Sequence, residues 1–167
     1  MAIPIPRNTY ERPTQVGLVP GVCCDAQDLG VQETQFGKKH QVSLAWQLEE
    51  KNSKGERFVV WRRFTASLDR RASLRKTLEL WRTKPYTDAE LDKFDLESVL
   101  GAPAMLLLEE KPGKDGDVFV NVAQVAPLPK GMPVLKVDPG YVRKRDRKDG
   151  THDTNEIPPE DAAAVPF

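Results

Sequence analysis

At 167 residues and 18.8 kDa the chain is long enough for one domain of ordinary size, since domains commonly hold about 100 to 200 residues. Lysine and arginine number 25, as do aspartate and glutamate, which excludes attraction of polyanions through a large overall charge. No stretch approaches the ~20 apolar residues of a membrane span and the first ten residues hold no signal-peptide core, so we expect a cytoplasmic protein.

The charges are distributed unevenly along the chain. Residues 151–167 contain four acidic residues and no lysine or arginine, so residues 1–150 hold 21 acidic and 25 basic residues. The body of the chain therefore carries +4 and the tail −4. Such a tail can occupy a cationic groove until a nucleic acid displaces it, or it can act only as a solubilising segment.

The first part of the chain predicts an arm and a strand. Residues 1–17 contain three prolines, which remove main-chain donors, so we expect an extended arm. Residues 21–33 predict a first strand, interrupted at the Asp-Leu-Gly sequence of residues 28–30.

A second strand is predicted after a basic turn at residues 36–40. In residues 42–48 apolar and polar side chains alternate, which is typical of a strand with one buried face, and Trp46 lies on that face. Residues 51–56 have the composition of a hairpin turn that leads into a third strand.

The third strand, residues 57–68, combines aromatic and basic side chains. One face holds Phe58, Val60, Arg62 and Phe64, and the other holds Val59, Trp61, Arg63 and Thr65. If the first face is buried, Trp61 and Arg63 point outwards. The alternative, that Trp61 lies in the core and the arginines are merely solvated, remains open.

A change of period predicts a helix after this strand. Leu74, Leu78 and Trp81 have the spacing of one helical face, and Ser67 or Asp69 can cap the start of the helix. This face predicts one helix that packs on the sheet.

The remaining elements are short. Thr87 and Glu90 have the spacing of a capping box and predict a second helix, followed by a helical turn at residues 96–100. The apolar run 104–109 and the alternating residues 118–123 predict two further strands.

This order of three strands, helix and two strands predicts a mainly β protein with an OB-fold. An OB-fold is a five-stranded Greek-key barrel that binds oligonucleotides along one face, here with a helix between strands three and four. We assign the barrel to residues 18–131. Residues 132–167 lack periodicity and predict a flexible linker and acidic tail.

A binding face for single-stranded DNA needs cations for phosphates and aromatic rings on which bases stack. The predicted stacking residues are Phe36, Trp61 and Phe119. The predicted phosphate ligands are Lys38, Lys39, Arg57, Arg62, Arg63, Arg70 and Arg71.

The last residues carry a resemblance to a known family. Acidic residues precede an apolar residue, proline and phenylalanine; the residues are Glu160, Asp161, Val165, Pro166 and Phe167. This tip resembles that of bacterial and phage single-stranded DNA-binding proteins, although three alanines follow Asp161. The resemblance implies sequence-independent DNA binding and recruitment of replication, recombination or repair proteins through the tip.

The body is similar to phage-encoded OB-fold proteins with single-stranded DNA-binding or replication roles. The segments that carry this similarity are 64–68, 74–82, 94–101 and 121–131. The resemblance implies binding rather than catalysis, and it identifies no individual DNA contacts.

Nothing in the sequence predicts an enzyme, a metal site or a cofactor. It has no phosphate-binding glycine loop, no Gly-x-Ser-x-Gly sequence and no paired histidines. The acidic residues between 88 and 97 fit a solvated helix face better than a nuclease site. Cys23 and Cys24 are adjacent, so we expect no disulfide between them.

Two other readings remain open. The same barrel can serve as an interaction module for a host or viral replication or recombination protein, in which case its exposed face should be apolar and uncharged. Alternatively, a nucleic-acid-binding accessory can load an enzyme through Phe167. Exposed edge strands also leave the oligomeric state open, since they can pair with another copy.

Overall fold

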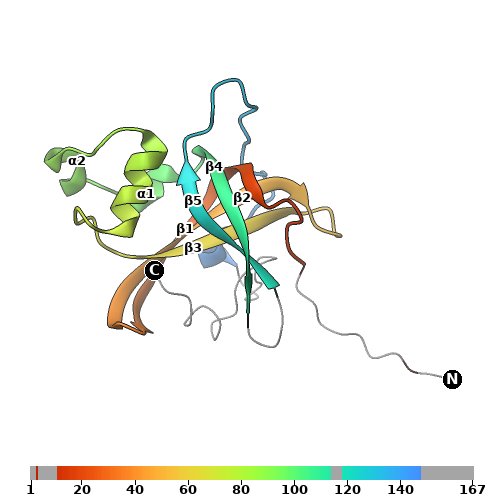
Figure 1. Cartoon of the computed structure of the whole chain (residues 1–167), viewed down its shortest axis with the longest axis horizontal. Helices are drawn as coiled ribbons and strands as arrows, with labels where there is room; N and C mark the ends of the chain where they lie inside the picture. The colour runs from red at the N-terminus through yellow and green to blue at the C-terminus, as the bar shows by residue number, and fades with distance from the viewer. Residues whose placement is uncertain (1–2, 4–10, 114–117, 148–167) are drawn as a thin grey trace.

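The computed structural model describes residue 3 and residues 11–113 and 118–147. In this part the chain is mainly β, with one five-stranded antiparallel sheet and short helical elements (Figure 1). The strands are β1 (Gly17–Thr34), β2 (Gly37–Lys51), β3 (Arg57–Thr65), β4 (Pro103–Pro112) and β5 (Val118–Ala126). The helical elements are α1 (Ser73–Arg82), α2 (Asp88–Asp92), η1 (Leu96–Val99) and η3 (Lys144–Asp146). The predicted mainly β class and order of elements are confirmed.

The long strand β1 lies at the centre of the sheet, whose strand order is β3-β2-β1-β4-β5. Its first residues pair with β4, and it pairs with β2 from Gly21 onwards. The pairing with β2 shifts register between Asp28 and Gly30, where the sequence predicted an interruption. Gly30 has a φ of +68°, a left-handed conformation that glycine adopts without strain, so the interruption is a β-bulge.

A second bulge in β1 was not predicted. The register shifts between Cys23, which faces Trp46, and Asp25, which faces Ala45. Regular alternation would place Cys23 and Asp25 on the same side of the sheet, but only Cys23 belongs to the main core. The inserted residue therefore turns Asp25 to the other face, where its carboxylate meets the chain that follows β5.

The main core lies between one face of the sheet and α1. The predicted apolar face of β2 is buried, and Trp46 is 0% exposed. The predicted helix face of Leu74, Leu78 and Trp81 is also buried. The Trp81 ring lies 5.9 Å from the Trp46 ring, and its Nε1 donates a hydrogen bond of 2.8 Å to the Pro103 carbonyl, which ties α1 to the start of β4.

The start of α1 differs from the prediction. Its N-cap residue is Ala72, and no side chain caps the helix, so the predicted cap by Ser67 or Asp69 is wrong. Both residues lie too far ahead of the helix and hydrogen bond within the preceding turn instead.

In the part of the chain described here, no helix is long and apolar enough to cross a bilayer.

The predicted capping box of α2 is confirmed. Thr87 Oγ1 accepts a hydrogen bond of 3.2 Å from the Glu90 main-chain N–H, and Glu90 Oε1 accepts one of 3.0 Å from the Thr87 N–H. The carboxylate of Glu90 also lies 2.9 Å from Arg82 Nη2. These reciprocal bonds fix α2 against the end of α1.

The chain after β5 does not behave as the linker predicted from residue 132. Residues 136–147, here called the covering segment, return across β1, β2 and β3, and their last residues appear in blue beside the sheet in Figure 1. The Lys136 carbonyl accepts from Arg57, and the Asp138 N–H donates to Gln47 Oε1. Individual polar contacts rather than a periodic apolar face hold this segment, so its sequence carries no periodic signal. Residues 148–167 of the predicted tail lie outside the described residues.

Cys23 and Cys24 are both buried, at 0% and 5% exposure. Burial in the apolar core raises the pKa of Cys23 to about 12. Its thiol is therefore unreactive at neutral pH.

Candidate nucleic-acid interface

The second face of the sheet carries the candidate site. The side of β1, β2 and β3 that is turned away from the main core is here called the outer face. Trp61 faces Ala45 across the β2–β3 ladder, and Arg63 faces Ser43. Phe58, Val60 and Phe64 belong to the main core, so alternation places Trp61 and Arg63 on the outer face, as predicted.

Trp61 is half-buried on this outer face. It packs on a small second cluster made by Cys24, Ala45 and Val59, to which Val137 and Tyr141 of the covering segment also belong. The ammonium of Lys144 lies 5.4 Å from the centre of its ring. Trp61 thus lies outside the main core, with one part of its ring against the sheet and another beside a cation.

Arg63 is a half-buried cation without a counter-ion in the described chain. Its guanidinium makes no ion pair or side-chain hydrogen bond with residues 11–113 or 118–147. Burial lowers its pKa, because the charged form loses water without gaining an anion. A phosphate oxygen beside Arg63 would supply that missing anion.

The β1–β2 hairpin adds exposed basic and aromatic groups. Lys38 and Lys39 are exposed, and the Phe36 ring at the tip is 70% exposed. Alternation along β2 places Lys39 on the outer face with Arg63, whereas Lys38 points to the opposite side. The structure therefore separates these two predicted phosphate ligands.

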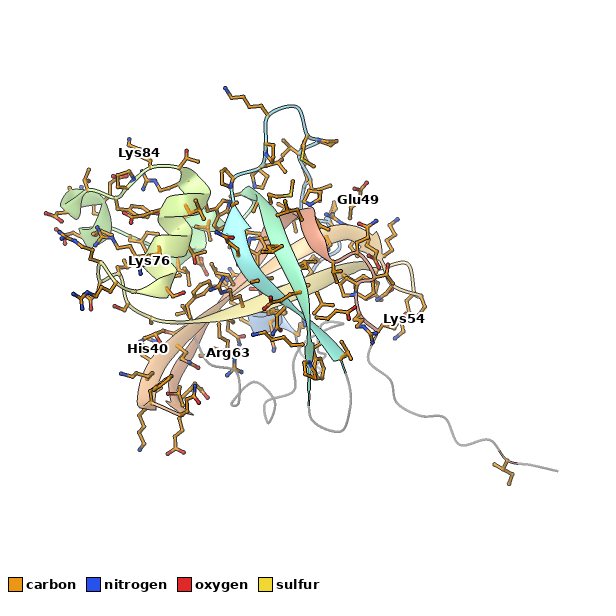
Figure 2. All side chains as sticks on the ribbon, viewed as in Figure 1. His40, Glu49, Lys54, Arg63, Lys76 and Lys84 are labelled. Atoms are coloured by element: carbon orange, nitrogen blue, oxygen red, sulfur yellow. The ribbon has the colours of Figure 1, made fainter. Side chains whose placement is uncertain are left out.

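The end of β3 lies beside the base of this hairpin. The Ala66 N–H donates a hydrogen bond of 2.8 Å to the His40 carbonyl, and Figure 2 shows His40 and Arg63 in the same region of the molecule. The predicted ligands Arg70 and Arg71 follow in the turn before α1, where both are exposed. Lys39, Arg63 and these two arginines therefore come from neighbouring parts of the fold.

Three other residues that were predicted to contact DNA have structural roles. Arg57 donates to the Leu48 carbonyl at 2.6 Å and to the covering segment at 2.7 Å. Arg62 points inwards, its guanidinium lies 4.9 Å from the Phe64 ring centre, and burial lowers its pKa. Phe119 is only 3% exposed, and its ring lies against Gly113, where an added Cβ would come within 2.2 Å of it. These contacts contradict the surface positions that the prediction required.

The predicted partner-binding residues Glu160, Asp161, Val165, Pro166 and Phe167 lie outside the described residues.

The sequence prediction missed the cations of the covering segment. Five of the six residues from 143 to 148 are lysine or arginine, a signal that was assigned to the linker because no periodicity accompanied it. In the structure Lys144 lies over Trp61, and Arg145 pairs with Glu97 at 2.8 Å. Arg143 binds Asp25 at 3.2 Å and Glu97 at 3.0 Å. The covering segment therefore brings Lys144 to the outer face, whereas Arg143 and Arg145 are paired with acidic side chains.

A separate pocket of about 760 Å³ lies between α1, α2 and η1. Its lining includes Trp81, Tyr86 and Phe94, and the Arg82 guanidinium lies 4.0 Å from the centre of the Tyr86 ring. Within the described ranges, no group of three or more His, Cys, Asp or Glu side chains could hold a metal ion. The described residues thus include a basic, partly aromatic face and, apart from it, a mainly apolar pocket.

Comparison with known proteins adds no identification. No protein-family model matches the chain, and no curated protein matches its sequence. The function is therefore inferred from the residues of the candidate site.

Proposed function

We propose that the protein binds single-stranded DNA, without sequence preference, on the outer face of β2 and β3. The observation that carries this proposal is Arg63, a half-buried guanidinium with no anion among the described residues, two positions from the partly exposed Trp61. Phosphates satisfy such a cation, and any base can stack on an indole ring because every base has a π-face.

The arrangement of strands supports an OB-fold, although the ladder does not close. β1 pairs with both β2 and β4, and α1 lies between the third and fourth strands of the chain. The outermost strands β3 and β5 approach each other, and Arg62 Nη1 donates to the Ala123 carbonyl at 2.9 Å. We infer a small barrel in which the Arg62 side chain, rather than a main-chain ladder, joins β3 to β5. Such barrels bind oligonucleotides on the face that carries Trp61 here.

In this role the protein would coat and protect single strands during DNA replication, recombination or repair, as a phage-type protein would in its host. Lys39, Arg63, Arg70 and Arg71 would follow the phosphates, and Trp61 and Phe36 would stack on bases. The acidic residues 160–161 and the tip 165–167 would recruit partner proteins. Removing residues 165–167 should then leave DNA affinity near normal and abolish capture of a partner.

The first test is tryptophan fluorescence during titration with oligo-dT and with a duplex of equal length, at two salt concentrations. Trp46 and Trp81 are buried, so a change on binding reports mainly on Trp61. We expect quenching by the single strand. If four cations each contact one phosphate, log affinity should fall with log salt with a slope of about −3.

A pair of variants tests the central observation. Arg63→Ala should weaken binding about tenfold or more, because it removes a charge-assisted hydrogen bond. Lys84→Ala is the matched control, since it removes one exposed cation near the end of α1, in the helical region away from Arg63 (Figure 2). Equal affinity of both variants would contradict the proposed site.

A second candidate function is binding of a protein partner in the pocket between α1, α2 and η1. Its apolar lining, with Trp81, Tyr86 and Phe94, favours this alternative. It predicts no fluorescence response to oligo-dT and no effect of Arg63→Ala. The charged outer face favours nucleic acid, because a face for a protein partner should be apolar at its centre.

A further inference from the structure

A buried carboxylate of β1 holds residues 141–144 of the covering segment. Asp25 is 1% exposed, and its two oxygens accept four hydrogen bonds from described residues. One comes from the neighbouring Ala26 N–H at 2.8 Å. The other three come from the covering segment: Tyr141 Oη at 3.0 Å, Arg143 Nε at 3.2 Å and the Lys144 N–H at 2.8 Å.

These hydrogen bonds hold the covering segment in one position on the sheet. A carboxylate buried without partners is strongly unfavourable, so displacement of the segment would leave Asp25 unsatisfied or force water into the sheet. Arg143 adds a hydrogen bond of 2.9 Å to the Ala26 carbonyl and an ion pair with Glu97. The segment is thus a fixed part of the outer face.

This attachment decides where Lys144 lies. Its main-chain N–H is held by Asp25, while its ammonium lies 5.4 Å from the centre of the Trp61 ring. An ammonium binds a phosphate oxygen more strongly than it binds an indole ring, so a phosphate that reaches this region is a favourable ligand for Lys144. A base that stacks on Trp61 brings its own phosphates into this region.

We propose that the covering segment forms the second side of the DNA-binding surface, with Lys144 as a phosphate ligand beside Trp61 and Asp25 as the residue that positions it. This inference rests on the proposed function, because it assigns further ligands to the same face. Its occupant is the phosphate backbone of a single strand that also contacts Arg63.

The test uses full-length variants and labelled oligo-dT at several salt concentrations. Lys144→Gln should weaken binding about three- to tenfold and reduce the magnitude of the log–log salt slope by about 0.7, the contribution of one phosphate contact. Lys84→Gln, the matched control, should change neither quantity. A purely structural role for Lys144 would leave the salt slope unchanged.

Asp25→Asn tests the positioning role. It keeps the size of the side chain but removes its charge, so amide hydrogen exchange in residues 136–147 should accelerate while that in β2 stays slow. Its affinity should fall further than that of Lys144→Gln. If Asp25→Asn does not fold, Tyr141→Phe removes only the hydroxyl donor and should cause smaller changes in the same direction.

The outcomes separate the two proposals. If the wild-type protein does not bind oligo-dT, the proposed function fails. Suppose instead that the wild-type protein binds oligo-dT and that Arg63→Ala weakens this binding. If Lys144→Gln then has the same affinity and salt slope as Lys84→Gln, only this inference is overturned. Tighter binding by Lys144→Gln would also overturn it, since Lys144 would then merely compete with bases for Trp61.

Discussion

Arg62 of β3 donates a hydrogen bond of 2.9 Å to the main-chain oxygen of Ala123 in β5, so a side chain joins the two outermost strands of the sheet. The same guanidinium lies 3.5 Å from Ser73 Oγ at the start of α1. One residue therefore connects both edges of the sheet and the helix. Its partial burial and its inward direction explain why it does not serve as a surface ligand.

This bridge predicts a loss of stability in Arg62→Met. The variant keeps most of the side-chain length but leaves the Ala123 carbonyl without its charged donor, which should lower the free energy of unfolding by about 1 to 3 kcal/mol. Urea denaturation followed by circular dichroism measures the change. Arg63→Met, on the same strand, is the control and should be nearly neutral. Similar stability of the two variants would rule out a structural bridge.

Trp61→Ala should weaken binding to oligo-dT by one to two orders of magnitude. Base stacking on an aromatic side chain contributes ~1 to 3 kcal/mol, and alanine offers no ring. Fluorescence anisotropy of a labelled oligonucleotide measures the affinity, and Trp61→Phe should retain part of it. Unchanged affinity in Trp61→Ala would mean that the ring serves only to hold the covering segment.

Adjacent lysines on the β1–β2 hairpin should differ in effect. Lys39 shares the outer face with Arg63, whereas Lys38 points to the opposite side. Lys39→Gln should therefore weaken binding and reduce the salt slope by about 0.7, and Lys38→Gln should change both much less. Titrations of the two variants at matched salt concentrations decide this. A reversed order would indicate that DNA follows the other side of the hairpin.

The carboxylate of Glu90 should titrate at an unusually low pH. A hydrogen bond from the Thr87 main chain, reinforced by the Arg82 side chain, lowers the pKa of Glu90 from its ordinary 4.5 to about 2. Because the folded value lies below the unfolded one, its stabilising contribution is complete above about pH 4.5 and is lost as the pH falls towards 2. NMR titration of the side-chain carbon measures this pKa.

A variant separates the causes of the Glu90 shift. Arg82→Gln removes the ion pair but leaves the capping box, so the pKa of Glu90 should rise part of the way to its ordinary value. Titration of wild-type Glu90 near 4.5 would show that the capping box does not persist in solution.

Much of the fold follows from local patterns in the sequence. The alternation around Trp46 and the helical spacing of Leu74, Leu78 and Trp81 predicted the buried faces correctly, because burial of a periodic face leaves a periodic apolar signal. The alternation of β3 likewise predicted the outward direction of Trp61 and Arg63. These predictions needed only the geometry of single elements.

The remaining features depend on contacts between distant residues. The bulge that turns Asp25 outwards lies in the pairing of β1 with β2, and the hydrogen bonds to Asp25 from residues 141–144 span more than 110 positions. No local pattern in the sequence reveals either of them. Arg57 and Arg62 were predicted to be surface cations, because the sequence does not distinguish an arginine that donates to a main-chain carbonyl from one that is solvated. Phe119 was predicted to be exposed because the alternation of residues 118–123 does not reveal its contact with Gly113.

The attachment of the covering segment also sets the smallest piece of this chain that should fold. A fragment ending at residue 131 would keep all five strands, yet it would expose the Asp25 carboxylate, the Gln47 amide and one side of Trp61 to water. The autonomous folding unit therefore extends at least to residue 147. Limited proteolysis should yield a stable core that retains Tyr141, Arg143 and Lys144.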